Sequence, residues 1–246
     1  MCGCTPVTYL AAGGTSPPPE PQAPADDGES PVQLEQAHRR AVAVAWTLAV
    51  LANLGHAALV PLGGSAAERL DAAAAQPGAT ELAVALEVAF RIGLCLGAVW
   101  IVHLVRQRRG PASVGAALVV AGSLASVLVN VPNLVWAQAP ADEVSRGVLV
   151  DVVDRLAASP SFLAITVTGL LSLTVGAVLL LIALRPTGWA PTWVLVSFLA
   201  GGVASSAAPN ERLALLVGAV LTGLPLAFIA SRAVREPARD VPVTHH

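Results

Sequence analysis

The sequence contains no lysine and little charge of either sign. All 14 basic residues are arginine, 16 residues are acidic, and charged residues make up only 12% of the 246 residues. A water-soluble domain carries about twice that charged fraction. The net charge of -2 excludes a general electrostatic attraction to nucleic acid, so no nucleic-acid partner is expected. The use of arginine alone, with abundant Ala, Val, Gly and Pro, is typical of a GC-rich bacterial genome.

Cysteine is also scarce. Cys2, Cys4 and Cys95 are too few for a disulfide framework, and two neighbouring thiols alone make a weak metal site. The sequence also has no phosphate-binding Walker loop and no CxxC motif. We therefore expect no metal ion, no cofactor and no catalytic residue.

Long apolar segments dominate what is present. Hydrophobic residues make up 55% of the chain, and the mean hydropathy is +0.69. A helix needs about 20 mostly apolar residues to cross a bilayer. We therefore predict an all-α membrane protein, a six-transmembrane-helix bundle within residues 41–231 whose first partner is the lipid bilayer. The spans are expected at about 41–62, 82–105, 113–136, 162–184, 189–208 and 211–231.

The two ends and one long loop differ from these segments. Residues 1–40 are rich in Pro and acidic residues and are predicted to be a disordered tail. Residues 232–246 form a second, polar tail. Within the loop, apolar residues recur at helical spacing, at Val144, Val148, Val152 and Leu156. This pattern predicts an amphipathic helix at about 142–157, which either lies on the membrane face or caps the bundle mouth.

The arginines predict the orientation. Nine fall on one side of the predicted spans: Arg39, Arg40, Arg106, Arg108, Arg109, Arg185, Arg232, Arg235 and Arg239. The other side has Arg69, Arg146, Arg155 and Arg212. Because short cytoplasmic loops are enriched in basic residues, both termini are expected in the cytoplasm and the chain in the plasma membrane. The tryptophans fall near predicted span ends, as in an aromatic belt: Trp46, Trp100, Trp136, Trp189 and Trp193.

Two ionisable residues lie inside the predicted second span. Glu87 and Arg91 each cost about 2.5–3.5 kcal/mol at the centre of a membrane helix. Their spacing of four residues, with the acid first, favours an ion pair within the helix. With a rise of about 1.5 Å per residue, polar residues of the first and third spans share their depth in the outer half of the bilayer. The resulting candidate polar cluster is Glu87, Arg91, Asn53, His56, Asn130 and Asn133.

The cluster has two interpretations, a buried pair that fixes helix register or a pocket for a small ligand, a solute or a proton. We expect a binding or interaction protein. The alternatives are a small-solute or proton-coupled transporter, and an intramembrane enzyme with His56 or Glu87 as base. The enzyme requires these two side chains within about 3 Å of each other or bridged by one water. A membrane-protein partner or a second copy would bind through small-residue helix faces, such as Gly201 and Gly202.

Three short pieces carry a resemblance. They are Phe90–Gly93 in the second span, the basic turn Arg106–Pro111, and Leu184–Trp193 between the fourth and fifth spans. Together they resemble a group of uncharacterised bacterial multi-pass membrane proteins of the domain-of-unknown-function kind. The resemblance implies a similar helix count over residues 41–231, and it implies no activity and no catalytic residue.

Overall fold

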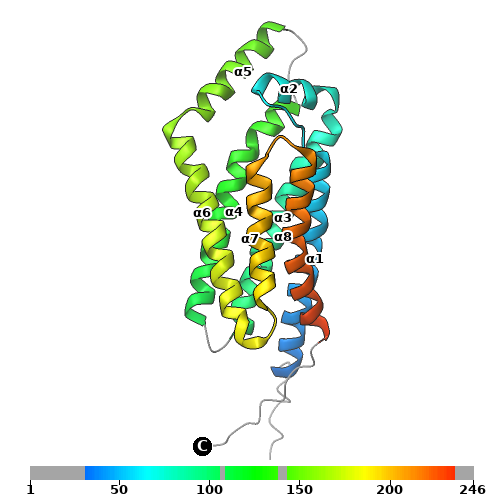
Figure 1. Ribbon diagram of the computed structural model, residues 1–246, viewed down its shortest axis with the longest axis vertical. Coiled ribbons are helices and arrows are strands. Elements are labelled where there is room, and N and C mark those ends of the chain that lie inside the picture. The colour runs from blue at the N-terminus through cyan, green and yellow to red at the C-terminus, as the bar shows by residue number, and fades with distance from the viewer. Residues whose placement is uncertain (1–30, 106–108, 138–142, 236–246) are drawn as a thin grey trace, which may run out of the picture. The chain divides into compact units, whose positions relative to one another are not determined.

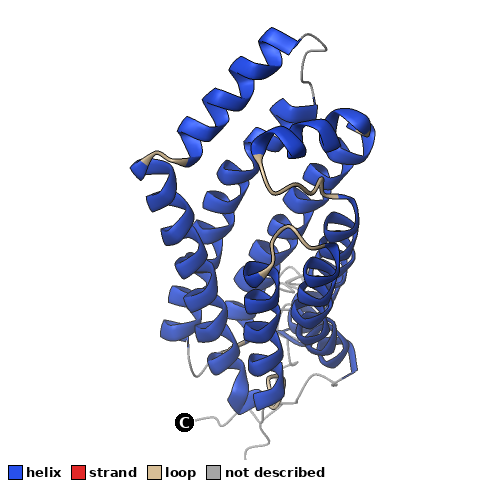
Figure 2. Ribbon diagram, turned by 45° about the horizontal axis from the view of Figure 1, so that its top comes forward, coloured by secondary structure: helices blue, strands red, loops and turns tan. Residues whose placement is uncertain are grey.

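The regular structure of the chain is helical throughout the residues that can be described (Figures 1 and 2). The computed structural model describes residues 31–105, 109–137 and 143–235. The helices are α1 (Pro31–Leu59), α2 (Ala66–Ala75), α3 (Pro77–Leu104), α4 (Arg109–Ala137), α5 (Glu143–Ala157), α6 (Pro160–Leu184), the 3-10 turn η1 (Arg185–Thr187), α7 (Thr192–Ala207) and α8 (Arg212–Arg235). The predicted all-α class is confirmed for these residues.

Among the residues that the structure describes, five helices are long and apolar enough to cross a membrane, namely α1, α3, α4, α6 and α8. They are compatible with a protein embedded in a bilayer. The predicted fifth span, 189–208, corresponds to α7, which has only 16 residues. It begins late because Gly188, the residue after η1, adopts the left-handed conformation (φ 79°), and Pro191 then precedes the first helical residue.

The first helix begins earlier than predicted. The predicted tail ended at residue 40, whereas α1 already begins at Pro31, so residues 31–40 are helical. Proline suits the first turn of a helix, and Glu35 pairs with Arg39 four residues later at 2.7 Å. The rest of that tail, residues 1–30, lies outside the described residues, as do residues 236–246. The second tail also begins later, since α8 continues to Arg235.

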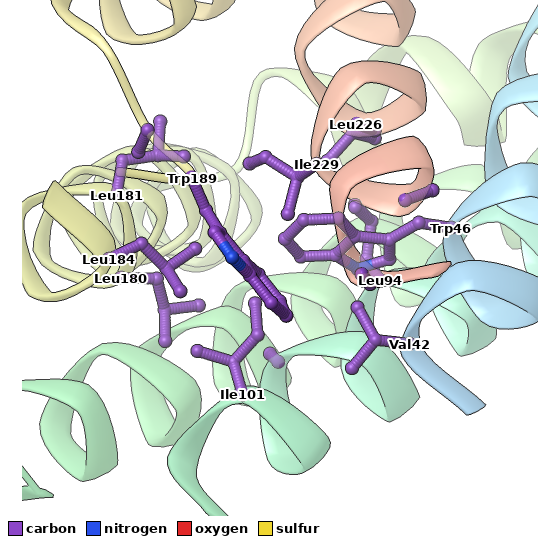
Figure 3. Close-up of a cluster of buried hydrophobic side chains, with 14 of the residues drawn as sticks. Val42, Trp46, Leu94, Ile101, Leu180, Leu181, Leu184, Trp189, Leu226 and Ile229 are labelled. Carbon is purple, nitrogen blue, oxygen red and sulfur yellow. The ribbon is translucent and has the colours of Figure 1, made fainter. Parts of the chain in front are cut away.

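The six long helices pack in a closed order, in which α1 contacts α3, α3 contacts α4, α4 contacts α6, α7 contacts α8 and α8 contacts α1. A weaker contact between α6 and α7 completes the circuit. The core lies in the middle and receives side chains from all six helices, among them Trp46, Leu94, Val119, Leu180, Val194 and Ile229. Figure 3 shows the part of this core around two indole rings.

Those two indole rings contradict the predicted aromatic belt. Trp46 and Trp189 are only 3% and 4% exposed, and both lie in the core (Figure 3). Trp46 fits because Gly97 of α3 leaves the space that its indole ring fills. Of the tryptophans whose side chains are described, only Trp193 is well exposed, and its ring meets Phe228 edge to face at 5.0 Å.

Glycines permit the close approach of neighbouring helices. In the α4–α6 seam, a methyl group on Gly176 would come within 2.7 Å of the carbonyl oxygen of Gly115 and of the backbone nitrogen of Val119. Gly122 meets Gly169 in the same way two turns further along. In the α7–α8 seam, Gly201 lies against the carbonyl oxygen of Gly218. Small residues therefore build the bundle itself, in agreement with their role in membrane helices.

The shorter helices α2 and α5 lie together at one end of the bundle (Figure 1). The predicted helix at 142–157 is present as α5. Its residues Leu149, Val150 and Val153 pack against Leu70 and Ala73 of α2. The predicted stripe is its other apolar face, and it stays exposed, with Val144 at 80% and Leu156 at 43%. Helix α5 therefore contacts the bundle through one face and leaves the second uncovered by the described residues.

We expect Gly176→Ala to destabilise the bundle by about 1–3 kcal/mol, the usual cost of overpacking, because backbone atoms cannot move away from the new methyl group. Gly202→Ala is the matched control, since Gly202 lies on the apolar helix α7 with no atom within 4 Å of the added methyl. Thermal unfolding in detergent measures both. Equal melting temperatures for the two variants would contradict the proposed packing of α4 on α6.

Candidate functional site

The candidate site lies in the seam between α1 and α3. A methyl group on Gly93 would come within 2.7 Å of the carbonyl oxygen of Ala45, so the two backbones are close. Further along the seam, Gly55 of α1 lies against the side chain of Leu86. This approach brings the last turns of α1 directly beside the second and third turns of α3.

Glu87 is buried in this seam and is neutralised within its own helix. Its side chain is 4% exposed. Arg91 places Nε at 2.7 Å and Nη2 at 2.6 Å from the same carboxylate oxygen, Oε1. A guanidinium often binds a carboxylate through both oxygens instead. Because both contacts end on Oε1, the second oxygen, Oε2, accepts no hydrogen bond from any residue that the structure describes.

His56 connects α1 to this pair. Its Nδ1 lies 2.9 Å from the carbonyl oxygen of Ala83, one turn before Glu87. Its other ring nitrogen, Nε2, faces Oε2 of Glu87 at 3.8 Å, which is too long for a hydrogen bond. The contact of about 3 Å that direct proton transfer requires is therefore not made in this conformation.

Arg91 also lies against an aromatic ring. Its guanidinium carbon is 4.9 Å from the centre of the Phe90 ring, within the range of a cation–π contact. Phe90 belongs to the buried core, whereas the Arg91 side chain is 17% exposed and that of His56 is 19% exposed. The trio of His56, Glu87 and Arg91 thus consists of a buried carboxylate and two partly exposed basic side chains beside it.

The asparagines of the predicted cluster differ in what the structure describes of them. Asn53 lies on α1 one turn before His56, is half-buried, and makes no hydrogen bond within the described part of the chain. Asn130 donates to the carbonyl oxygen of Ser126 in its own helix at 3.0 Å. Asn133 lies in α4, but its side chain is outside the described residues. The sequence predicted six members, and the described contacts connect three.

Arg212, which the sequence analysis did not assign to the site, lies beside it. This first residue of α8 donates from Nη1 to the carbonyl oxygen of Ala57 at 3.0 Å. The last carbonyl groups of a helix lack partners within the helix, so a cation there is favourable. The contact fixes α8 to α1 next to His56. The need for donors to the last carbonyl groups of the first span could have suggested a basic residue here. It would not have distinguished Arg212 from the other arginines outside the spans.

A second cluster was also missed, at the opposite end of the bundle. The rings of His38 and His103 stack with centres 5.5 Å apart, and Trp100 lies 4.6 Å from His38 and 5.9 Å from His103. His38 was missed because it was assigned to the tail. Two imidazoles are too few to bind a metal firmly. In the residues that the structure describes, no three His, Cys, Asp or Glu side chains gather to hold a metal ion.

A small cavity of about 30 Å³ lies in the apolar core rather than at the trio. Its walls include Trp46, Leu94, Leu173 and Phe198, and no residue of the predicted polar cluster lines it. Its volume is close to that of one water molecule, but empty apolar cavities of this kind usually stay dry. The polar chemistry of the site therefore has to be read from the trio itself.

Glu87→Gln and Arg91→Gln should each cost about 3 kcal/mol or more, since either leaves a buried charge without its partner. The double variant should recover much of that loss. Thermal unfolding in detergent gives the comparison. Asp151→Asn and Arg155→Gln are the control pair, with the same spacing on an exposed helix, and should change little. Additive losses in the double variant would show that the Glu87–Arg91 contact is not formed.

The comparisons with known proteins identify no relative. No protein-family model matches the chain, and no curated protein or solved structure was found to be similar to it.

Proposed function

We propose that the chain is a six-span protein of the plasma membrane with both termini in the cytoplasm. Helix α7, the fifth of these spans in chain order, is the one added to the five helices that are long enough to cross by themselves. Its end lies at the α2 side, where Arg69 contacts Asn210 at 3.4 Å, and its beginning lies at the other side, where the Arg39 guanidinium lies 5.5 Å from the Trp189 ring. Helix α1 covers the same length between Arg39 and Ala57, about 27 Å at the usual helical rise. With the residues from Trp189 to Pro191 that precede it, α7 would cover the same length.

The arginines support the proposed orientation. The described arginines at the end away from α2 are Arg39, Arg40, Arg109, Arg185, Arg232 and Arg235. At the α2 end, each described arginine contacts a protein oxygen: Arg69 that of Gly63, Arg146 that of Asp71, Arg155 that of Asp151, and Arg212 that of Ala57. The bias in number follows the positive-inside rule.

A reporter inserted after Gly64 should lie outside the cell, and one inserted after Gly188 should lie in the cytoplasm. Both glycines are exposed in short connections, so an insertion there leaves the helices intact. A third reporter after Asn210 tests α7 directly and should lie outside. Cytoplasmic reporters after both Gly188 and Asn210 would show that α7 does not cross, and a cytoplasmic reporter after Gly64 would reverse the orientation.

The same proposal makes the protein a binding or interaction protein whose ligand contacts the trio. The observation that supports this is the unequal use of the Glu87 carboxylate. One oxygen takes both contacts from Arg91, whereas Oε2 and the facing His56 nitrogen have no donor among the described residues. Asn53, one turn away, adds an amide that makes no hydrogen bond to the residues that the structure describes. Intramembrane ionisable groups with unused bonding capacity are candidates for ligand contact.

Small-residue faces support a protein partner less well. Gly122 packs against Gly169 and Gly201 packs against Gly218, so both are used within the bundle. Gly202 remains open, with no atom within 4 Å of an added methyl group. Self-association would therefore have to use Gly202 without the neighbouring glycine.

A small ligand that donates hydrogen bonds should stabilise the folded protein, because binding only to the native state raises its melting temperature. The test compares methylammonium with acetate at equal concentration and ionic strength. Methylammonium should raise the melting temperature of the natural sequence and leave that of the Glu87→Gln/Arg91→Gln double variant unchanged. A flat response to both compounds, or a rise that persists in the double variant, would contradict ligand contact at the trio.

A small-solute or proton-coupled transporter is the second candidate, favoured by the partial exposure of His56 and Arg91 beside the buried acid. Uptake of methylammonium into vesicles that contain the protein separates the two functions. A binding protein gives a thermal shift without uptake, whereas a transporter gives both.

A further inference from the structure

The tautomer of His56 is determined by its surroundings. A backbone carbonyl oxygen can only accept a hydrogen bond, and Nδ1 lies 2.9 Å from the carbonyl oxygen of Ala83. Nδ1 must therefore carry a proton. In the neutral ring, the other nitrogen, Nε2, then has a lone pair and no hydrogen.

That lone pair faces another acceptor. Oε2 of Glu87 lies 3.8 Å from Nε2, and neither atom has a donor among the described residues. Two acceptors that face each other in an apolar setting repel, and the ion pair with Arg91 keeps Glu87 in the acceptor form. One added proton converts the repulsion into an N–H···O contact, and a closure of about 0.6–1.1 Å would give normal hydrogen-bond length.

We infer that Nε2 of His56 and Oε2 of Glu87 together bind one exchangeable proton, which joins α1 to α3 in the membrane. This inference rests on the proposed function, since it names the simplest occupant of the same site. The proton adds to the Nε2 lone pair and forms an imidazolium, and the Glu87 carboxylate accepts the new N–H. No bond to carbon changes, and the solvent supplies the proton.

Few other charges face this pair. Helix α3 contributes Arg91, whose guanidinium binds Oε1 of Glu87. Helix α8 contributes Arg212, which is bound to the carbonyl oxygen of Ala57. The described side chains of α4 between Ser113 and Asn130 include no titratable group. The charged groups of α2 are bound elsewhere: Glu68 to Gly64, Arg69 to Gly63 and Asn210, and Asp71 to Arg146. Among the described residues, Nε2 of His56 and Oε2 of Glu87 are therefore the two facing atoms that are left to share a proton.

The test is nitrogen NMR of the full chain labelled with ¹⁵N at histidine only, in lipid nanodiscs, as a function of pH. His56→Gln identifies the His56 signals. Nδ1 of His56 should keep its hydrogen at every pH, and Nε2 should gain one as the pH falls. In Glu87→Gln this step should be lost over the same pH range, because the new amide donates to Nε2 and the negative charge is gone. The signals of His103, at the opposite end of the bundle, are the internal control and should be the same in both proteins.

If Glu87→Gln fails to fold, the Glu87→Gln/Arg91→Gln double variant replaces it, since it leaves no buried charge alone, and its Nε2 should likewise gain no hydrogen. The inference is overturned if Nδ1 loses its hydrogen, if Nε2 never gains one in the natural sequence, or if the step is unchanged in these variants. A proton step without any thermal shift from methylammonium would instead contradict only the proposed ligand binding. A thermal shift from methylammonium without a proton step at Nε2 would contradict only the proton site.

Discussion

The close approach of helix backbones at glycine is the constraint on which the bundle depends. Apolar side chains gain little from leaving lipid for a protein interior, so membrane helices must associate through tight packing. Gly115 with Gly176 and Gly201 with Gly218 provide this packing in two seams, and Gly93 provides it between α1 and α3. The last of these also determines the polar site, because an imidazole on α1 reaches a carbonyl and a carboxylate on α3 only when the two backbones are close.

The polar site and the seam therefore stabilise one another. Glu87 is neutralised within its own helix by Arg91, which lets a charged residue enter an apolar helix at reduced cost. His56 then crosses the seam without needing a charge of its own. Arg212 binds the end of α1 beside it, so the positions of α1, α3 and α8 at this level are linked by polar contacts as well as by packing.

Much of this arrangement follows from sequence pattern. Apolar length predicted the helical class and the approximate helices, and spacing by four predicted the Glu87–Arg91 contact. Patterns within one helix are readable because the helix geometry is known in advance. The predicted beginning of α1 was wrong because the proline-rich composition of residues 1–40 indicated disorder, although Glu35 and Arg39 have the spacing of a helical ion pair. The burial of Trp46 and the bond from His56 to Ala83 depend on which helix lies opposite, and no spacing within one segment contains that information. The same reason explains why equal depth suggested six cluster members and the described contacts connect three.

The distribution of arginine has an electrical consequence along the bundle axis. At the α2 end, the guanidinium groups of Arg69, Arg146 and Arg212 are bound to oxygen atoms of neighbouring segments, so they act as ties between helices. Several arginines at the other end, such as Arg40 and Arg185, are exposed. The molecule thus carries a permanent charge asymmetry between its ends. A membrane potential exerts about 2.3 kcal/mol on each elementary charge per 100 mV. In the proposed orientation, an inside-negative potential would hold the exposed arginines on the inner side, so the voltage itself would oppose inversion of the folded bundle.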